Sequence, residues 1–155
     1  MIPTVIEAHL RQRHPGFEHH THSMAMTAQD LAAAEHVSGR RVAKPVIVSL
    51  DGQLAMAVVA ATERVNLAAL EEATGRAVEL VPESVFSRSF EPCEAGAEPP
   101  LAVFGVPIFV DQKLEAERTL VMQAGTHEDA VVLDTREWLS CEKPQAIANL
   151  GVRVQ

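Results

Sequence analysis

The sequence contains few aromatic residues and few cysteines, and it contains no Tyr at all. Aromatic residues make up 4% of the 155 positions, which disfavours a platform on which nucleic-acid bases stack. Cys93 and Cys141 are the only cysteines. They are far apart and form no C-x-x-C pair, so neither a disulfide framework nor a thiolate zinc site is indicated.

Long hydrophobic runs and an excess of basic charge are also missing. No stretch approaches 18 uncharged apolar residues, so no membrane-spanning helix is expected. The first ten residues carry Glu7 and His9, which is not typical of a signal peptide. The 13 Lys and Arg against 21 Asp and Glu give a net charge of -8. This argues against a non-specific nucleic-acid binder, which depends on neutralising phosphates, but allows a local basic patch. We expect a soluble, cytoplasmic protein without a membrane partner.

The composition is that of a globular protein, with 47% hydrophobic and 22% charged residues. The length predicts one domain over residues 1–155. Periodicity and capping signals predict helices over 3–14, 28–37, 67–74, 82–90 and 135–141. The β-rich runs predict strands over 17–23, 42–50, 53–60, 78–81, 106–110, 119–123 and 130–133.

Hairpin connections outnumber crossovers in this order of elements. Asp51-Gly52 between two β-rich runs is a strong signal for a tight hairpin. No G-x-G-x-x-G follows a predicted strand, which excludes a Rossmann fold. The predicted fold class is therefore α+β, with a mixed, largely antiparallel sheet surrounded by helices.

Lys44 is the first candidate functional residue. It precedes Pro45, which favours an extended conformation at Lys44. Because proline has no N–H, this strand is expected to lie at an edge or to carry a bulge there. A lysine held between apolar neighbours is a candidate site cation. The alternative is a lysine whose stem lies on the sheet while its ammonium reaches water.

The second candidate is the segment from Phe90 to Pro100, which holds Gly96 and three prolines. Gly96 can adopt a positive φ, and Pro99-Pro100 restrict the backbone that follows. Such a turn can present backbone N–H groups to an anion or oxyanion. The alternative is an ordinary surface turn.

Histidines give two weaker signals. His127 lies between two predicted strands, where it either lines a site or belongs to a plain hairpin turn. His20 and His22 share one face of a strand and could bind a metal, although the spacing supplies no third ligand. No metal site and no cofactor is predicted. A metal-dependent hydrolase built on these two histidines remains a rival hypothesis.

Several catalytic motifs are missing. The sequence has no G-x-S-x-G, no H-E-x-x-H and no Walker loop. Glu91 and Glu94 flank Cys93, and acidic neighbours raise the pKa of a thiol. A covalent nucleophile is therefore not indicated.

Taken together, the motifs resemble the prolyl-tRNA editing superfamily, the bacterial trans-editing aminoacyl-tRNA deacylases similar to the insertion domain of prolyl-tRNA synthetase. The resemblance runs from about Phe17 to Trp138. Its segments occur in the family's order and are residues 27–32, 41–44, 94–100, 105–111 and 124–127.

The resemblance implies that Lys44 corresponds to the family's site lysine, and that Gly96 and Pro100 end its G-x-x-x-P loop. His127 would correspond to a histidine that lines the aminoacyl pocket in some members. The family's usual Pro-Phe-Gly reads Pro100-Leu101-Ala102 here, so the wall of the pocket differs. Substrate contacts are expected from Ala97, Pro100, His127, Val46 and Ile108, with Val106 as a further wall residue.

The implied activity is hydrolysis of mischarged aminoacyl-tRNA in trans. Water would attack the ester, positioned by Lys44 and the Gly96 loop, with a substrate ribose hydroxyl assisting. The expected partner is the acceptor end of an aminoacyl-tRNA, with an aminoacyl-tRNA synthetase as a second candidate partner. The alternative is a catalytically inactive tRNA- or ligand-binding accessory module of the same fold.

Overall fold

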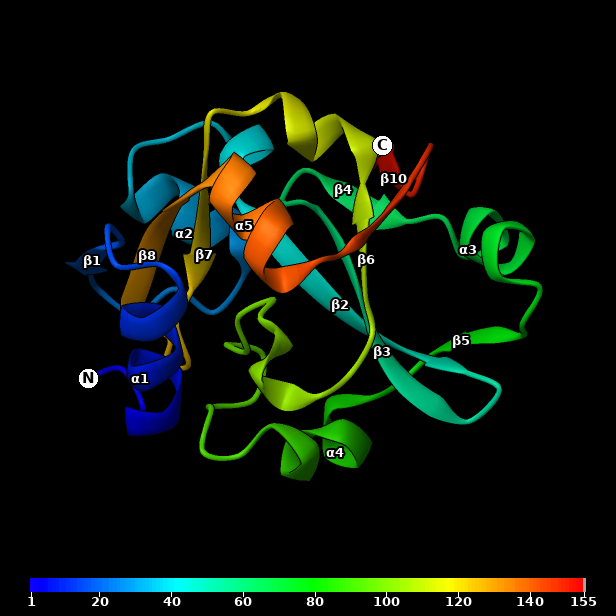
Figure 1. The fold of residues 1–155 in the computed structure, drawn as a ribbon, viewed down its shortest axis with the longest axis horizontal. Coiled ribbons are helices and arrows are strands. Elements are labelled where there is room, and N and C mark those ends of the chain that lie inside the picture. Colours follow the sequence, from blue (N-terminus) through cyan, green and yellow to red (C-terminus); the bar gives the residue numbers. More distant parts are fainter. Residues whose placement is uncertain (155) are drawn as a thin grey trace.

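The computed structural model describes residues 1–154, which form five α-helices and ten strands (Figure 1). The helices are α1 (Thr4–Arg13), α2 (Ala28–Ala34), α3 (Leu67–Thr74), α4 (Glu83–Phe86) and α5 (Thr135–Glu142). The strands are β1 (Glu18–Thr21), β2 (Ala43–Leu50), β3 (Gln53–Ala60), β4 (Glu63–Val65), β5 (Val78–Leu80), β6 (Ile108–Asp111), β7 (Thr119–Gln123), β8 (Asp129–Asp134), β9 (Gln145–Ile147) and β10 (Gly151–Arg153). Over this part of the chain, no helix is long and apolar enough to cross a bilayer.

The strands form three sheets. The largest has the order β5-β2-β3-β6-β9, and its β3–β6 and β6–β9 pairs are parallel while the others are antiparallel. An antiparallel sheet has the order β1-β8-β7, and β4 pairs with β10. Figure 1 shows α1 and the three-stranded sheet at one end of the molecule and α3 at the other. The predicted α+β class with mixed, largely antiparallel pairing is confirmed, although the strands are divided among three sheets.

The β2–β3 hairpin forms as its turn sequence predicts. Leu50 lies opposite Gln53, so Asp51 and Gly52 alone make the turn. Their φ angles are 48° and 89°. Two successive positive φ angles define the turn whose twist matches the flanking strands, which is why Asp-Gly is favoured there.

The open edge of β2 begins at Pro45. The Val81 N–H donates to the Ile47 carbonyl (3.3 Å), so the backbone of Ile47 faces away from β3. Pro45 lies two residues earlier and faces the same side, where pairing with β5 is confined to Val48–Leu50. The missing N–H of Pro45 therefore falls on an unpaired edge, as predicted.

The core has two main parts, one on each face of the large sheet. The central cluster joins α1, α5 and the two larger sheets and includes Ile6, Leu10, Met56 and Trp138. On the opposite face, Leu70 of α3 packs with residues of β2 and β3. The apolar alternation along β2 and β3 thus supplies both clusters.

Several boundaries differ from the sequence prediction. Helix α2 ends at Ala34 rather than Val37, because His36 takes a positive φ of 55°. Strand β6 begins at Ile108, directly after Pro107. The helix predicted over 82–90 is split into α4 and a 3-10 turn at Ser87–Phe90. Strands β4, β9 and β10 were not predicted; each has three residues, and none stands out as a β-rich run as the equally short β5 does.

The contribution of the N-cap residue Asn66 to helix α3 can be tested by substitution. Asn66 accepts a hydrogen bond from the Ala69 N–H (3.2 Å). We expect Asn66→Ala to lower the free energy of unfolding by about 1 kcal/mol, because an N-terminal amide of the helix loses its acceptor. Asn66→Asp keeps a capping oxygen and serves as the control. Urea denaturation measures both, and equal midpoints for Asn66→Ala and wild type would contradict the assignment.

Candidate functional site

A cavity of about 690 Å³ lies against the open edge of β2. Its walls come from residues 42–47, the start of α2, the segment from Leu80 through α4, and the turn at Gly96 and Glu98. Thr27 and Asp30 form a capping box, which fixes the start of α2 at this wall. Lys44, Val46 and Gly96, all singled out from the sequence, line the cavity.

Lys44 is half-buried at the junction of this cavity and a neighbouring hollow that Arg64 also lines. Its ammonium donates to the Glu63 carbonyl oxygen (2.5 Å). Burial lowers the pKa of Lys44, and the nearby Glu63 charge opposes that shift. An ammonium has three N–H groups, so two remain to donate to a ligand.

The Gly96 turn is shaped by two glutamates. Gly96 has a φ of 87°, which favours glycine, and a Cβ there would lie 2.8 Å from Glu83 Oε1. The Gly96 N–H donates to Glu98 Oε2 (3.0 Å), and the Ala97 N–H donates to the Glu94 carbonyl (2.9 Å). The amides of Gly96 and Ala97, in the turn that the sequence suggested as an anion cradle, therefore have partners within the loop.

His127 contacts the loop that contains Gly96 and holds it in place. It is buried, with Nε2 2.9 Å from the Ala95 carbonyl oxygen and Nδ1 3.2 Å from that of Ala25. The backbone N–H of His127 donates to Glu94 Oε1 (2.8 Å). These contacts attach the loop to the β7–β8 connection and to the segment before α2. His127 is thus placed to position the loop rather than to line the cavity.

Three residues predicted to contact substrate do not reach the cavity wall. Ala97 is fully buried, and its carbonyl accepts the Gly125 N–H (2.9 Å). The Pro100 carbonyl accepts the indole N–H of Trp138 (2.9 Å). Ile108 belongs to the central core. This corrects their placement, since the loop and β6 turn these residues toward the interior. Val106 likewise packs against the core without lining the cavity.

Glu98 is a cavity residue that the sequence reasoning missed. It is 3% exposed and lines the cavity. Burial raises the pKa of Glu98, while hydrogen bonds from its own amide and that of Gly96 oppose the shift and the charge of Glu83 adds to it. A buried carboxyl group with a raised pKa in a cleft is typical of functional sites. The available signal was an acid enclosed between Gly96 and Pro99.

The histidine pair of the rival metal hypothesis does not converge on a shared site. His20 Nδ1 lies 2.5 Å from Glu35 Oε1, and His22 Nδ1 lies 2.6 Å from the Ser23 carbonyl oxygen. Within residues 1–154, neither histidine belongs to a group of three side chains arranged to hold a metal ion.

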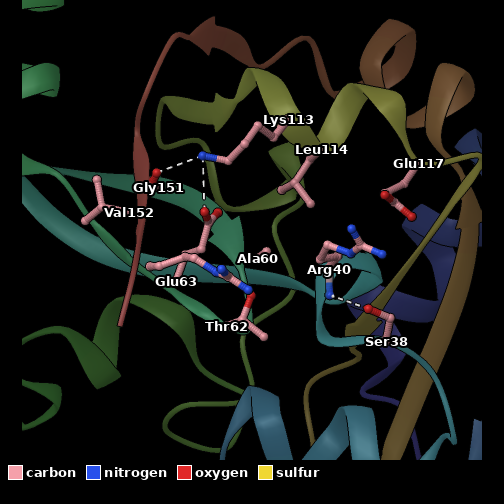
Figure 2. A pocket seen from close by; sticks show the side chains of 11 residues that line it. Ser38, Arg40, Ala60, Thr62, Glu63, Lys113, Leu114, Glu117, Gly151 and Val152 are labelled. Carbon is pink, nitrogen blue, oxygen red and sulfur yellow. Dashed lines mark hydrogen bonds and ion pairs between the residues drawn. The ribbon is translucent and has the colours of Figure 1, made fainter. Parts of the chain in front are cut away.

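A second cavity of about 730 Å³ is lined by Glu63, whose carbonyl contacts Lys44. Figure 2 shows Lys113 reaching the Gly151 carbonyl and the Glu63 carboxylate, with Arg40 on the other side of the cavity. Lys113 also pairs with Asp111 (3.0 Å). Glu63 therefore links the two cavities, with its carbonyl on Lys44 and its carboxylate on Lys113.

The family model of the aminoacyl-tRNA editing domain matches residues 22–141, which include the whole cavity wall at β2, α4 and Gly96. The chain belongs to the aminoacyl-tRNA editing domain family. The resemblance inferred from the ordered motifs is thereby confirmed at the level of the family. No curated protein matches the chain.

Solved structures share the fold of this editing domain. The hypothetical protein APE2540 superposes with a TM-score of 0.85 at 19% identity, covering 96% of this chain and 99% of that one. A candidate trans-editing enzyme for prolyl tRNA synthetase gives 0.79 at 16% identity, covering 94% and 96%. A candidate signal transduction protein from Marinobacter aquaeolei VT8 gives 0.75 at 18% identity, covering 98% of this chain and 31% of that one. At these identities the similarity concerns the fold.

The thiol nearest the loop of the editing domain should be inert. Cys93 is 8% exposed, and burial, aided by the charge of Glu98, raises its pKa to about 12. We expect iodoacetamide at neutral pH to modify the partly exposed Cys141 and to leave Cys93 unmodified in the folded protein. Mass spectrometry of tryptic peptides measures both sites, and unfolded protein is the control in which both react. Faster labelling of Cys93 than of Cys141 would contradict the assignment.

Proposed function

We propose that this editing domain is a trans-acting deacylase that hydrolyses mischarged aminoacyl-tRNA. The observation that carries the proposal is that Lys44 and the Gly96 turn line one cavity in a member of this family. Water adds to the ester carbonyl carbon, and the bond to the ribose oxygen breaks. The products are the free amino acid and a tRNA with a free terminal hydroxyl.

The cavity suits the acyl end of the substrate. Apolar side chains of Leu31, Val46, Ile47 and Phe86 line it, so a small side chain has a dry surface to contact. Such a surface discriminates only weakly between amino acids that differ by one methylene, because that group contributes about 1–3 kcal/mol of binding free energy in an apolar pocket. The open edge of β2 next to Pro45 leaves room for the ester to lie along the strand.

Lys44 supplies the positive charge in this mechanism. Its contact with the Glu63 carbonyl fixes the direction of the ammonium, and its remaining N–H groups donate to the developing oxyanion or to the terminal phosphate. Partial burial strengthens such a contact, because water competes less there.

Glu98 and Glu83 supply the negative charge beside the Gly96 turn. An aminoacyl ester carries an α-ammonium group, which these carboxylates attract. Because the Gly96 N–H is bonded to Glu98, the loop contributes to the mechanism by orienting this carboxylate. His127 acts as a positioning residue, since it holds the loop through the Ala95 carbonyl.

Although the chain is acidic, arginine side chains line the hollows that adjoin the cavity. The hollow next to Lys44 includes Arg64, a further hollow joins Arg64 to Arg153, and the cavity of Figure 2 joins Arg153 to Arg40. These three arginines are exposed, and none of them forms an ion pair within residues 1–154. They offer contacts to acceptor-stem phosphates. A synthetase that delivers the tRNA would compensate for the small number of contacts.

The role of Lys44 is tested by deacylation of alanyl-, cysteinyl- and seryl-tRNAs in which the tRNA belongs to a different amino acid. We expect Lys44→Met to lower turnover by about 10²-fold or more, because a charged donor to the oxyanion is lost. Lys143→Met at the exposed end of α5 is the matched control. Wild-type turnover in Lys44→Met would contradict the role. Binding of tRNA without turnover by the wild type would favour the accessory-module alternative.

The role of Glu98 is tested by the pH dependence of kcat/KM. Because the folded pKa is raised above the ordinary value of 4.5, the carboxylate gains its proton at a higher pH than an exposed glutamate does. We expect activity to fall as the pH is lowered through that raised pKa, and Glu98→Gln to abolish this acidic limb. Glu91→Gln, an exposed neighbour, should keep it. An unchanged profile in Glu98→Gln would contradict the role.

A further inference from the structure

A buried cluster of two histidines and a glutamate joins α1 to the end of α5. His9 lies on α1, His14 follows directly after it, and Glu142 is the last residue of α5. His9 Nε2 lies 2.9 Å from Glu142 Oε1, and His14 Nε2 lies 2.5 Å from Glu142 Oε2. One ligand atom from each of the three side chains lies within 4.8 Å of the others. None of the three lines the editing cavity.

Both ring nitrogens of His14 face a carboxylate. Nδ1 lies 3.2 Å from Glu137 Oε1 while Nε2 faces Glu142. A neutral imidazole has a single N–H, whereas an imidazolium has two, so both carboxylates are satisfied when the Nε2 position holds either a second proton or a metal cation. A cation between His14 Nε2, His9 Nε2 and Glu142 satisfies every group, since Nδ1–H then donates to Glu137.

The surroundings match those of metal ligands in proteins. An imidazole that binds a metal commonly donates its other N–H to a carboxylate, and Glu137 occupies that place. Glu142 Oε1 also accepts the Ala102 N–H (2.7 Å), which orients the carboxylate. His14 and Glu142 are fully buried side chains, whereas His9 is 12% exposed and gives a route from solvent.

We propose that His9, His14 and Glu142 bind Zn²⁺ or a similar divalent transition-metal ion. Two imidazoles and a carboxylate are typical zinc ligands, and water completes the set. The ion would fasten α1 to α5 and to Ala102, which follows the Gly96–Pro100 loop. The site is distinct from the His20–His22 pair and does not depend on the deacylase activity.

Metal binding by the purified, chelator-treated protein tests the site directly. Titration with zinc chloride, followed by calorimetry, should show one equivalent bound, and the midpoint of thermal unfolding should rise with added zinc. His9→Gln should weaken binding by about tenfold or more, and Glu137→Gln by about 10–100-fold. His20→Gln is the matched control, because His20 also pairs with a carboxylate, and it should bind as the wild type does.

Two results would overturn the site: no stoichiometric binding by the wild type, or unchanged affinity in His9→Gln. Loss of binding in His20→Gln alone would assign the metal to the other histidine pair. Glu142→Gln removes a buried carboxylate and can impair folding, so the partly exposed His9 carries the decisive comparison. Visible absorption of the Co²⁺-substituted protein provides a second readout: nitrogen ligation should change the spectrum in wild type, and His9→Gln should need a higher Co²⁺ concentration and give a different spectrum because one nitrogen ligand is lost.

Discussion

The absence of an N–H at Pro45 is the constraint on which the site depends. An edge strand normally offers a row of donors and acceptors that another strand can pair with. Here β5 pairs only with the last part of β2, and Pro45 interrupts the row where pairing stops. The sheet therefore leaves an opening at this edge, which α2, α4 and the Gly96 turn surround without closing. Lys44 precedes the proline and is held extended at the rim of that opening.

The loop that faces Lys44 is held by contacts with segments distant in sequence. Backbone hydrogen bonds join Glu94 and Ala97 to Gly125, and His127 contributes its ring and its N–H. A Cβ at Gly125 would lie 2.6 Å from Pro3, so the N-terminal segment packs directly against this connection. Such bracing limits the conformations of the turn, and preorganised groups need less rearrangement when a charge develops next to them.

Local signals in the sequence were sufficient for most of the elements and for part of the site. The Thr27 capping box, the Asp51-Gly52 turn and the edge at Pro45 each depend on a few consecutive residues, and the structure contains all three. Whether Ala97, Pro100 or Ile108 faces a cavity or the core depends on how sheets and loops pack, which a single sequence does not specify. The cluster of His9, His14 and Glu142 joins residues more than 120 positions apart, so no local pattern could indicate it.

The distribution of charge reconciles an acidic chain with a polyanionic substrate. The net charge of -8 is a sum over the whole molecule, whereas association depends on the local field at the surface that meets the ligand. Several acidic groups are paired within the fold: Asp129 with the N-terminal ammonium, and Glu63 and Asp111 with the one ammonium of Lys113. The exposed arginines at positions 40, 64 and 153 lie next to the hollows that continue from Lys44. Phosphates would therefore meet positive charge next to Lys44, where the cavity adjoins these hollows, and the acidic remainder would disfavour other orientations.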